Sequence, residues 1–419
     1  MNRTGRSLLV VGILAAALNL RPAAASVGPL LTRIRADTGL SAVAAGALTT
    51  LSVVCFGAFA PVAPGLARRL GTRAAIAGAM VVLTAGIALR MVPAVEFLFL
   101  GTVMAGAGIA VANVLLPVLV RGSLHEHTGL VTGAYTTALI GFAALAAIVW
   151  APLARRNTAE EKDPEDERPA RPDSTGDHGH LEGASDAMSR TSAANTSNGS
   201  SSARTMLRDP LAWTVTLFFG IQSAGFYASL AWLPSIFQSH GASESRAGLY
   251  LAASMIAGLA AALLLPNVAA RSRDQRGLAL GATALTAVGW IGILVAPMWA
   301  PLLWVAILGL GQNGTFPLVM TMIVLRGGTV ANTARLSTQA QTVGYLIAAL
   351  APLGAGALHQ VTGSWTPVVA ALAALTLPQA FAGVSAGRDA TVASGAAVAR
   401  RARRLTPARS RTGRADRSS

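Results

Sequence analysis

An arginine stands near the centre of the first apolar run of the chain, where a fixed positive charge is costly. The run covers residues 8–31 and also holds Asn19 and Pro22. About 20 apolar residues cross a bilayer as a helix, and a charge at that depth costs roughly 2.5–3.5 kcal/mol on insertion scales. We therefore expect Arg21 to line a polar pathway and to attract a small anionic or electron-rich solute by charge-assisted hydrogen bonds. The alternative is that its side chain reaches the interface or braces neighbouring helices.

The surroundings of Arg21 follow from helix geometry. At 1.5 Å per residue, Arg21 lies roughly 20 Å along a helix that begins near Leu8, which is past the midplane of the bilayer. Asn19 lies two residues earlier, so its side chain points about 200° away and cannot share the face of Arg21. Asn19 is therefore expected either to contact the solute or to hold a neighbouring helix. Pro22 frees a backbone carbonyl, which is tolerated where a helix lines a cavity.

Amide and phenol side chains in later apolar runs supply further candidates for solute binding: Asn113, Gln222, Tyr227, Gln312, Asn313, Gln339 and Tyr345. The amides can bind a solute or join helices to one another, and the tyrosines can stack on a planar solute or serve in packing. Asn113 and Asn313 each lie four residues before a proline, which places each on the face of a weakened helical turn. Gln339 and Gln341 are two residues apart, so we expect one of them to face a cavity.

Acidic residues are absent from the apolar runs. The nearest ones, Asp37, Glu96 and Glu244, fall in predicted outer loops, so a carboxylate proton relay within the membrane has no candidate. His359, beside a predicted helix, is either a proton relay or an ordinary residue at a helix end. Coupling stays open between uniport, anion exchange and proton symport. The sequence contains no nucleotide-binding loop or metal-binding cluster, so we expect no cofactor, no ATP-driven pump and no enzyme.

The composition is typical of a polytopic membrane protein. Of 419 residues, 53% are hydrophobic and 12% are charged, against about 25% charged residues in soluble proteins. The formal charge of +15 lies in short loops and in the tail, a distribution that sets membrane topology. We therefore expect a monomer with membrane lipid, and no nucleic acid, as its partner. Cys55 is the one cysteine and is predicted to be a small buried hydrophobic residue.

Short polar breaks divide the chain into eleven apolar runs. Five precede a polar segment, and six follow it: 8–31, 45–66, 73–92, 97–120 and 129–153, then 211–233, 247–267, 277–296, 300–325, 338–358 and 365–387. The predicted units are an N-terminal transmembrane bundle (1–154), a disordered charged linker (155–208), a C-terminal bundle (209–388) and a basic disordered tail (389–419). The linker holds too few apolar residues to offset the entropy of ordering it.

The arginines predict an inner (plasma) membrane protein with both termini in the cytoplasm. Arg3 and Arg6 precede the first run, and the loops of both halves are basic. Five runs before the linker would place it outside, whereas the arginines of the second half require it inside. The run 129–153 begins like a fifth helix and ends like a sixth. We therefore expect that about one helix of twelve is missing there; the alternative is that one half inserts against its charge bias.

A repeated pattern relates the two halves. The end of the fourth run carries two glycines, an asparagine and a proline, and so does the matching run of the second half: Gly106, Gly108, Asn113 and Pro117; Gly309, Gly311, Asn313 and Pro317. A basic residue follows each pattern, and then a helix that opens with glycine and tyrosine: Arg121, Gly133 and Tyr135; Arg326, Gly344 and Tyr345. Matching halves predict parallel repeats with a site between them near the middle of the membrane.

Seven segments together resemble the cyanate/2-nitroimidazole transporter branch of the major facilitator superfamily. They are NLRPAAASVGPLL (19–31), ANVLLPVLVR (112–121), TGAYTTAL (132–139), AWLPSIFQSHGAS (231–243), LGLGQNGTFPL (308–318), ARLSTQAQTVGYLIAALAP (334–352) and LHQVTGSWTP (358–367). The resemblance implies twelve helices in two bundles that work by alternating access. ARRLGTR (67–73) resembles the basic cytoplasmic loop of the superfamily, which implies a gating role for Arg68, Arg69 and Arg73; the alternative is topology-setting charge alone.

The expected function is secondary active or facilitative transport of a small anion or a small planar organic solute, similar to cyanate or a nitroimidazole. Drug or metabolite efflux on the same fold is an alternative, because the sequence does not set the direction of transport. A membrane protein without transport activity is a second alternative, because about one helix is missing near the fifth and sixth positions.

Overall fold

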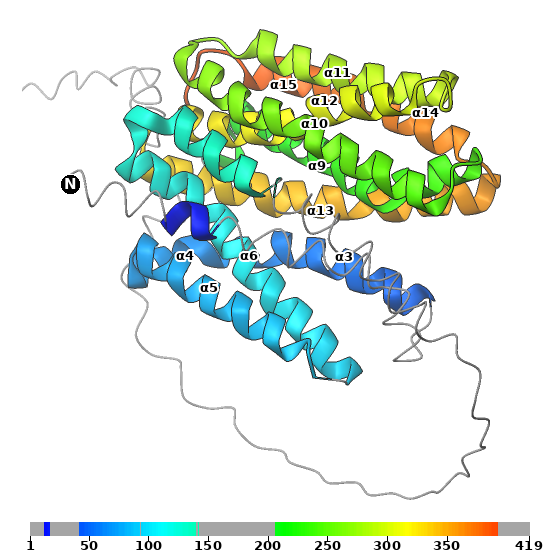
Figure 1. Cartoon of the computed structure of the whole chain (residues 1–419). Coiled ribbons are helices and arrows are strands. Elements are labelled where there is room, and N and C mark those ends of the chain that lie inside the picture. Colours follow the sequence, from blue (N-terminus) through cyan, green and yellow to red (C-terminus); the bar gives the residue numbers. More distant parts are fainter. Residues whose placement is uncertain (1–11, 17–41, 93, 140, 142–205, 393–419) are drawn as a thin grey trace, which may run out of the picture.

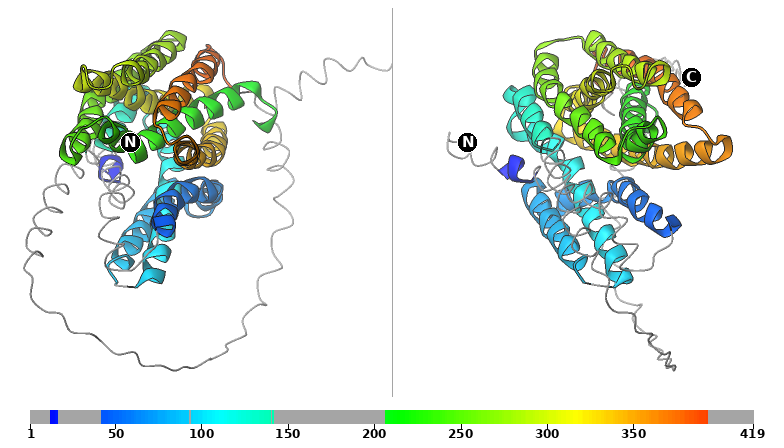
Figure 2. Two further views of the ribbon diagram at one scale, coloured as in Figure 1. Left: turned by 90° about the vertical axis from the view of Figure 1, so that its right-hand side faces the viewer. Right: turned by 45° about the vertical axis from the view of Figure 1, so that its right-hand side comes forward.

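The computed structural model describes residues 12–16, 42–92, 94–139, 141 and 206–392. The regular elements within these ranges are helices, with no strand among them. Figure 1 shows two groups of helices, α3 to α6 in one and α9 to α15 in the other, with α13 lying against α3 and α6. Figure 2 shows the same two groups from two further directions. The prediction of an all-α protein is confirmed.

The first group contains α3 (Ala42–Phe59), α4 (Val62–Leu70), α5 (Thr72–Leu89), α6 (Val95–Ser123) and the single turn η1 (His125–His127). Residues 128–139 are helical as well. The predicted span 45–66 consists of two helices, because α3 and α4 are bent by 53° at a short break. Pro61 lies at this break, where its missing N–H and fixed φ interrupt the helical hydrogen bonds.

The second group contains seven helices: α9 (Pro210–Ser239), α10 (Glu244–Arg271), α11 (Arg276–Val295), α12 (Pro301–Gly327), α13 (Val330–Thr362), α14 (Thr366–Ala374) and α15 (Thr376–Ala386). α13 begins at Val330 rather than at 338, because Thr329 caps it by accepting a hydrogen bond from the N–H of Asn332 at 3.2 Å. The first turns of α13 are polar, so the apolar run that starts at 338 does not include them.

With α14 and α15 counted as one span (366–386), seven of the described helices are long and apolar enough to cross a membrane, and the bent pair α3 and α4 makes up to eight. α9 is not among the seven, although it has 30 residues, because buried polar side chains such as Gln222 and Ser229 interrupt it. The predicted first span, apart from residues 12–16, lies outside the described residues. So do the end of the predicted span 129–153, most of the predicted linker and the tail from 393 onward.

Close packing of α6 in the first half depends on two glycines. A Cβ added to Gly106 would lie 2.6 Å from the Cβ of Cys55 on α3. A Cβ added to Gly108 would lie 2.5 Å from the carbonyl oxygen of Ala79 on α5. α6 therefore lies directly against both neighbouring helices, and Cys55 is buried as predicted.

α12 is packed by the matching glycines in the same way. A Cβ added to Gly309 would lie 1.9 Å from the carbonyl oxygen of Ser254 on α10. A Cβ added to Gly311 would lie 2.4 Å from the hydroxyl oxygen of Thr286 on α11. Gly106 and Gly309 thus pack against α3 and α10. Gly108 and Gly311 pack against α5 and α11. The repeat predicted from sequence is present in the packing.

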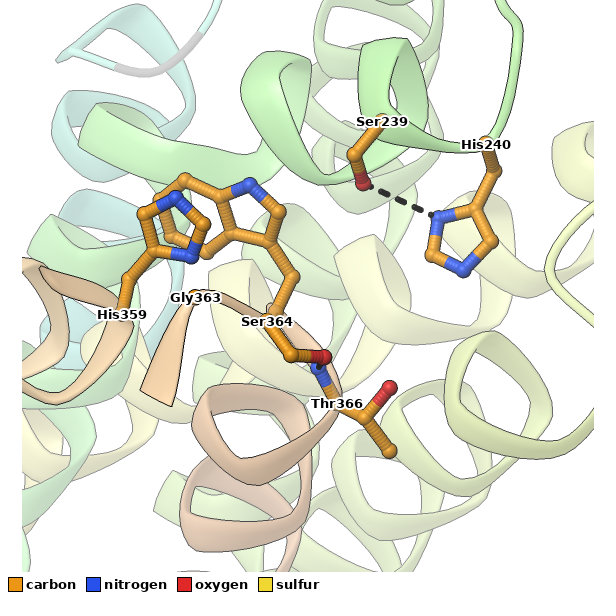
Figure 3. Close-up of a pocket in the computed structure, with 7 residues that line it drawn as sticks. Ser239, His240, His359, Gly363, Ser364 and Thr366 are labelled. Atoms are coloured by element: carbon orange, nitrogen blue, oxygen red, sulfur yellow. Dashed lines mark hydrogen bonds between the residues drawn. The ribbon is translucent and has the colours of Figure 1, made fainter. Parts of the chain in front are cut away.

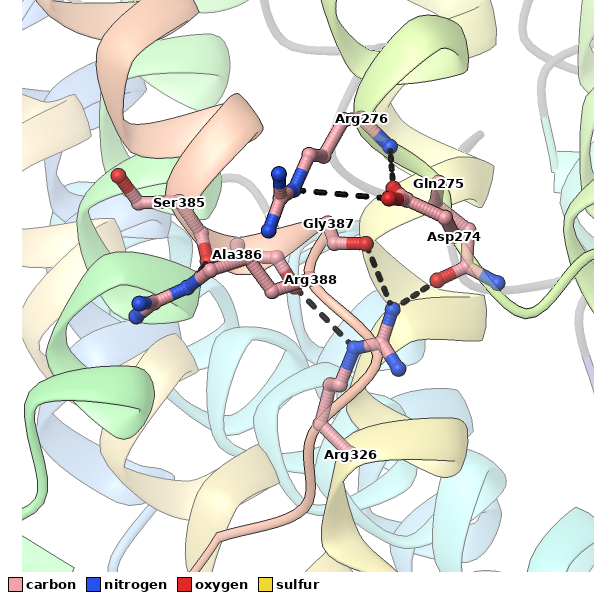
Figure 4. A network of polar contacts seen from close by, with 8 residues as sticks. All are labelled: Asp274, Gln275, Arg276, Arg326, Ser385, Ala386, Gly387 and Arg388. Atoms are coloured by element: carbon pink, nitrogen blue, oxygen red, sulfur yellow. Dashed lines mark hydrogen bonds and ion pairs between the residues drawn. The ribbon is translucent and has the colours of Figure 1, made fainter.

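Arg326, near the end of α12, holds the last part of the described chain to the second half. Its side chain is buried and donates to the carbonyl oxygens of Ala386 at 3.1 Å and Gly387 at 3.0 Å, and also to the side chain of Gln275 (Figure 4). The N–H of Val392 donates to the carbonyl oxygen of Arg326 at 2.9 Å. The packed chain therefore continues past the predicted end of this unit at 388.

The two ends of the bundle differ in charge. The basic end comprises the turns α4–α5, α6–η1, α10–α11 and α12–α13, which carry most of the described arginines: Arg68, Arg69, Arg73, Arg121, Arg271, Arg273, Arg276, Arg326 and Arg335. The opposite end comprises the turns α5–α6, α9–α10, α11–α12 and α13–α14. Both halves thus place their basic turns at one end, as the charge pattern of the sequence predicts.

Replacement of Gly309 by alanine should destabilise the protein. The added methyl group would lie 1.9 Å from the backbone oxygen of Ser254, and overpacking of this kind costs about 1–3 kcal/mol. The midpoint of thermal unfolding in detergent is the measurement. Gly248→Ala on α10 is the matched control, since nothing lies within 4 Å of the added Cβ and alanine favours a helix over glycine by about 1 kcal/mol. Equal midpoints would contradict the close packing of α12 on α10.

Candidate functional site at the seam between the two halves

Pro117 leaves one carbonyl of α6 without its helical partner, and a side chain of the other half binds it. Proline has no N–H, so the carbonyl of Asn113, four residues earlier, receives no helical hydrogen bond from position 117. The side-chain amide of Gln341 on α13 donates to this oxygen at 3.0 Å. The weakened turn is the one predicted from the spacing of Asn113 and Pro117. The hydrogen bond that satisfies it comes from the second half of the chain.

Three residues of α13, spaced by four, face α6. The hydroxyl of Ser337 donates to the carbonyl oxygen of Val114 at 3.0 Å, and the amide of Gln341 donates also to the Ser337 hydroxyl at 2.9 Å. The side-chain amide of Asn113 donates to the hydroxyl of Tyr345 at 3.4 Å. We call Asn113, Val114, Ser337, Gln341 and Tyr345 the seam. Ser337 is not among the predicted site residues, although its spacing of four residues from Gln341 is the signal for a shared helix face.

The ring of Tyr345 is where aromatic side chains of the two halves meet. Its centroid lies 5.3 Å from that of Phe56 on α3, 5.1 Å from that of Phe219 and 6.4 Å from that of Tyr227 on α9, and all three contacts are edge to face. Such pairs contribute about 0.5–1.5 kcal/mol each beyond area burial. The aromatic cluster therefore stabilises the seam.

A second polar group joins α9 to α12 within the second half. The amide of Gln222 donates to the backbone oxygen of Gln312 at 3.1 Å, and the side-chain amide of Gln312 pairs with the hydroxyl of Ser229 at 3.1 Å. The hydroxyl of Ser223 donates to the side-chain oxygen of Gln222 at 3.2 Å. In this conformation the two glutamines join helices, and Gln222 lies one turn from Phe219 and so from the aromatic cluster.

Asn313 occupies the repeat position of Asn113 but points into its own half. Its amide donates to the backbone oxygen of Ser254 on α10 at 3.4 Å, and its side chain lies close to Gly258. The reason is the neighbour: α6 lies against α13 of the other half, whereas this face of α12 lies against α10. Asn313 is therefore not brought to the seam.

Gln339 is buried on another side of α13. Its amide has no hydrogen-bond partner among the described residues. It lies about 200° around the helix from Gln341, on the side of Thr342 and Leu346, which contact Gly57 of α3. Gln341, rather than Gln339, belongs to the seam.

The remaining predicted site residues lie apart from the seam or outside the described residues. Arg68 and Arg69 are exposed at the end of α4, and Arg73 is exposed at the start of α5. Gly71, between them, has a φ of 84° that favours glycine. These arginines form part of the basic end. Asn19 and Arg21 lie outside the described residues.

A polar recess of about 370 Å³ lies at the opposite end of the bundle (Figure 3), lined by Ser239, His240, His359, Gly363, Ser364, Trp365 and Thr366. The ring of His359 stacks on Trp365, with centroids 3.9 Å apart and planes 9° apart. His359 is 14 residues from Tyr345 along α13, which corresponds to roughly 20 Å. The structure therefore places it at a helix end and away from the seam.

Comparison with known proteins decides the family. The profile described as Major Facilitator Superfamily matches residues 136–352. The chain belongs to this superfamily. It is 37% identical to the uncharacterized transporter YycB of Bacillus subtilis (strain 168), over 91% of this chain and 94% of that protein. It is 34% identical to the 2-nitroimidazole transporter of Escherichia coli (strain K12), over 92% of this chain and 96% of that protein.

A third relative completes the assignment to a branch of the superfamily. The cyanate transport protein CynX of Escherichia coli (strain K12) is 30% identical over 83% of this chain and 89% of that protein. The chain therefore belongs to the cyanate/2-nitroimidazole transporter branch, as its motifs indicated. Among solved structures, the major facilitator superfamily transporter FucP of E. coli, in the outward conformation, matches with a TM-score of 0.67, 12% identity and coverage of 89% of this chain and 97% of that chain. This likeness confirms the superfamily fold of an integral, multi-pass membrane protein.

The seam of this transporter offers neutral hydrogen-bonding groups. Gln341 Oε1 of the seam is buried without a hydrogen-bond partner among the described residues, and so, among others, are Ser52 Oγ on α3 and Thr342 Oγ1 on α13. Buried polar atoms are normally hydrogen-bonded, so the amide oxygen can accept a bond, and each hydroxyl can accept or donate one, when a solute or water reaches it. The chemistry supported by the seam is recognition by amides, hydroxyls and aromatic rings.

Replacement of Gln341 by leucine should lower the free energy of unfolding less in a protein that carries alanine at position 117 than in the parent. In the parent, Gln341→Leu leaves the Asn113 carbonyl unpaired, which costs about 1–3 kcal/mol. Alanine at position 117 restores the helical N–H for that carbonyl. The free energies of unfolding of the parent, Gln341→Leu, Pro117→Ala and the double variant form a double-mutant cycle. Strict additivity of the two substitutions would show that the Gln341 bond does not serve the carbonyl freed by Pro117.

Proposed function

We propose that this transporter carries a small anion or a small planar organic solute across the inner membrane by alternating access, as a secondary active or facilitative carrier and not as an enzyme. The observation that supports this is the seam, where amides, hydroxyls and aromatic rings of both halves meet. A site shared by two halves changes its access when the halves move relative to one another. The relatives named for 2-nitroimidazole and cyanate support the class of solute.

The roles proposed for the site residues follow from their chemistry. Tyr227 and Tyr345 stack on a planar solute, since both lie in the aromatic cluster. Asn113 hydrogen-bonds the solute from the seam. Gln222 and Gln312 do so from α9 and α12 once the solute replaces their bonds between helices.

Three predicted residues have weaker or different support. Arg21 supplies the fixed positive charge that the neutral seam lacks. For Asn313 and Gln339, the packing away from the seam favours a role in joining helices over contact with the solute.

The basic end is proposed to face the cytoplasm, because basic turns favour that side. Both chain termini then lie in the cytoplasm, and Arg68, Arg69 and Arg73 lie where the helices of the first half end. The transporter is proposed to act as a monomer in contact with lipid. The exposed apolar side chains that would meet the lipid include Val81 on α5, Leu264 on α10 and Leu280 on α11.

The segment between the two halves should be reached from the cytoplasmic side. α9 begins at the basic end, since Phe218 lies against Gly383 and Arg326 binds Gly387 there. A protease site inserted within residues 190–204 should be cut in inside-out vesicles and protected in right-side-out vesicles. Cleavage in right-side-out vesicles would reverse the proposed orientation of the second half.

Uptake into proteoliposomes tests the proposed function, with cyanate and 2-nitroimidazole as labelled solutes. We expect Arg21→Ala to lower cyanate uptake about tenfold or more, because a hydrogen bond to a charged group contributes about 1.5–3 kcal/mol. Uptake of neutral 2-nitroimidazole should fall less. Arg21→Lys keeps the charge and should retain part of the activity, and Arg388→Ala, at an exposed position, should change nothing. Undiminished cyanate uptake by Arg21→Ala would show that Arg21 is not part of the proposed site.

A further inference from the structure

Arg121 and Arg326 follow the same repeated pattern but bind different parts of the molecule. Arg326 is buried and donates to Ala386, Gly387 and Gln275, all of its own half (Figure 4). Arg121, at the end of α6, is half-buried and donates to the carbonyl oxygen of Gly328. Gly328 lies in the turn between α12 and α13. The Arg121 bond therefore joins the first half to the second at the basic end.

The acceptor of this bond lies in a turn that requires glycine. Gly328 has a φ of 68°, in the left-handed region that other residues avoid. It follows the last residue of α12 and precedes the cap of α13, so its carbonyl oxygen lies outside the hydrogen bonds of both helices. A guanidinium group can therefore bind it without competing with helical donors.

Other contacts between the halves lie at the same end. A Cβ added to Gly122 would lie 3.7 Å from a methyl carbon of Val330 at the start of α13. A Cβ added to Gly129 would lie 2.8 Å from the Cβ of Ala270 at the end of α10. Together with the Arg121 bond, these contacts bring the described parts of the two halves together at the basic end.

We propose that Arg121 acts as a latch that holds the basic end closed and releases Gly328 when that end opens. The latch rests on the proposed function, since alternating access requires the end to open. One bond from a charged donor to a neutral carbonyl can break in each cycle. The several bonds of Arg326 stay within one half, so they remain intact when the halves separate. Arg121 is a positioning residue that does not touch the solute.

Disulfide formation across the latch measures closure without any solute. In a Cys55→Ala background, Gly122→Cys and Val330→Cys place two thiols at the closed basic end, within reach of one another. We expect an oxidant to link the two thiols quickly and the disulfide to stop uptake. A reductant should then restore uptake. Each single-cysteine variant is the control and should keep its uptake under oxidant. Failure of the pair to link, or full uptake by the linked protein, would overturn the proposed closed end.

The role of Arg121 is tested by the rate of the same reaction. Arg121→Gln should slow disulfide formation about tenfold, because the end spends less time closed. Arg276→Gln is the matched control: Arg276 lies at the same end, but its side chain pairs with Asp274 of its own half at 3.6 Å, so the rate should stay at the parental value. An unchanged rate for Arg121→Gln, or equal slowing by both variants, would overturn the latch.

The two proposals can fail separately. Slower linking in Arg121→Gln with no solute transported by the parent would keep the latch and remove the proposed function. Transport with an unchanged linking rate would do the reverse. Gel filtration and thermal unfolding verify that each variant is folded. If Arg121→Gln does not fold, Arg121→Lys replaces it. The shorter lysine side chain should slow linking severalfold, and a parental rate would contradict the latch.

Discussion

The missing N–H of Pro117 is the constraint on which the meeting of the two halves depends. Inside a membrane, no water replaces a lost helical donor, so the freed carbonyl of Asn113 requires a partner. Gln341 supplies it from α13 at 3.0 Å, and its further bond to Ser337 holds the amide in one orientation. Tyr345, one turn along, then lies among aromatic rings of α3 and α9. The missing hydrogen bond in α6 thus fixes how α13 lies against α6. The position of α13 then determines which of its side chains reach the middle of the protein.

Under the proposed function, a site built from these groups selects a solute by its pattern of hydrogen bonds rather than by its charge. Amides and hydroxyls can donate to an anion or bind a neutral heterocycle, and an unsuitable solute leaves them unpaired at a cost of about 1–3 kcal/mol each. Aromatic rings add a preference for planar groups. As proposed, the seam alone would therefore bind both a small anion and a small planar solute. Under the proposed function, discrimination by charge has to come from elsewhere, and Arg21 is the residue in the sequence with the means to supply it.

Sequence alone predicted the helices well, because a long apolar run between basic loops is typical of a helix that crosses a membrane. It failed where tertiary contacts decide. The start of α13 was placed at 338 because its first turns are polar; those polar residues face α6 and a cap rather than solvent. The bend between α3 and α4 depends on Pro61, which hydropathy does not register. Asn113 and Asn313 each lie four residues before a proline, yet Asn113 reaches the other half and Asn313 its own, because different helices lie beside them.

The different partners of Asn113 and Asn313 illustrate a difference between glycines and polar residues in the repeat. The glycines serve the same packing in both halves, since one pair brings α6 against α3 and α5 and the other pair brings α12 against α10 and α11. Polar residues at equivalent positions differ, because their partners lie beyond the repeated unit. Arg326 finds acceptors in the last helix of its own half, whereas Arg121 finds one in the turn of the other half. Internal symmetry thus governs what holds each half together, while the contacts between the halves, on which movement depends, arise where the symmetry is broken.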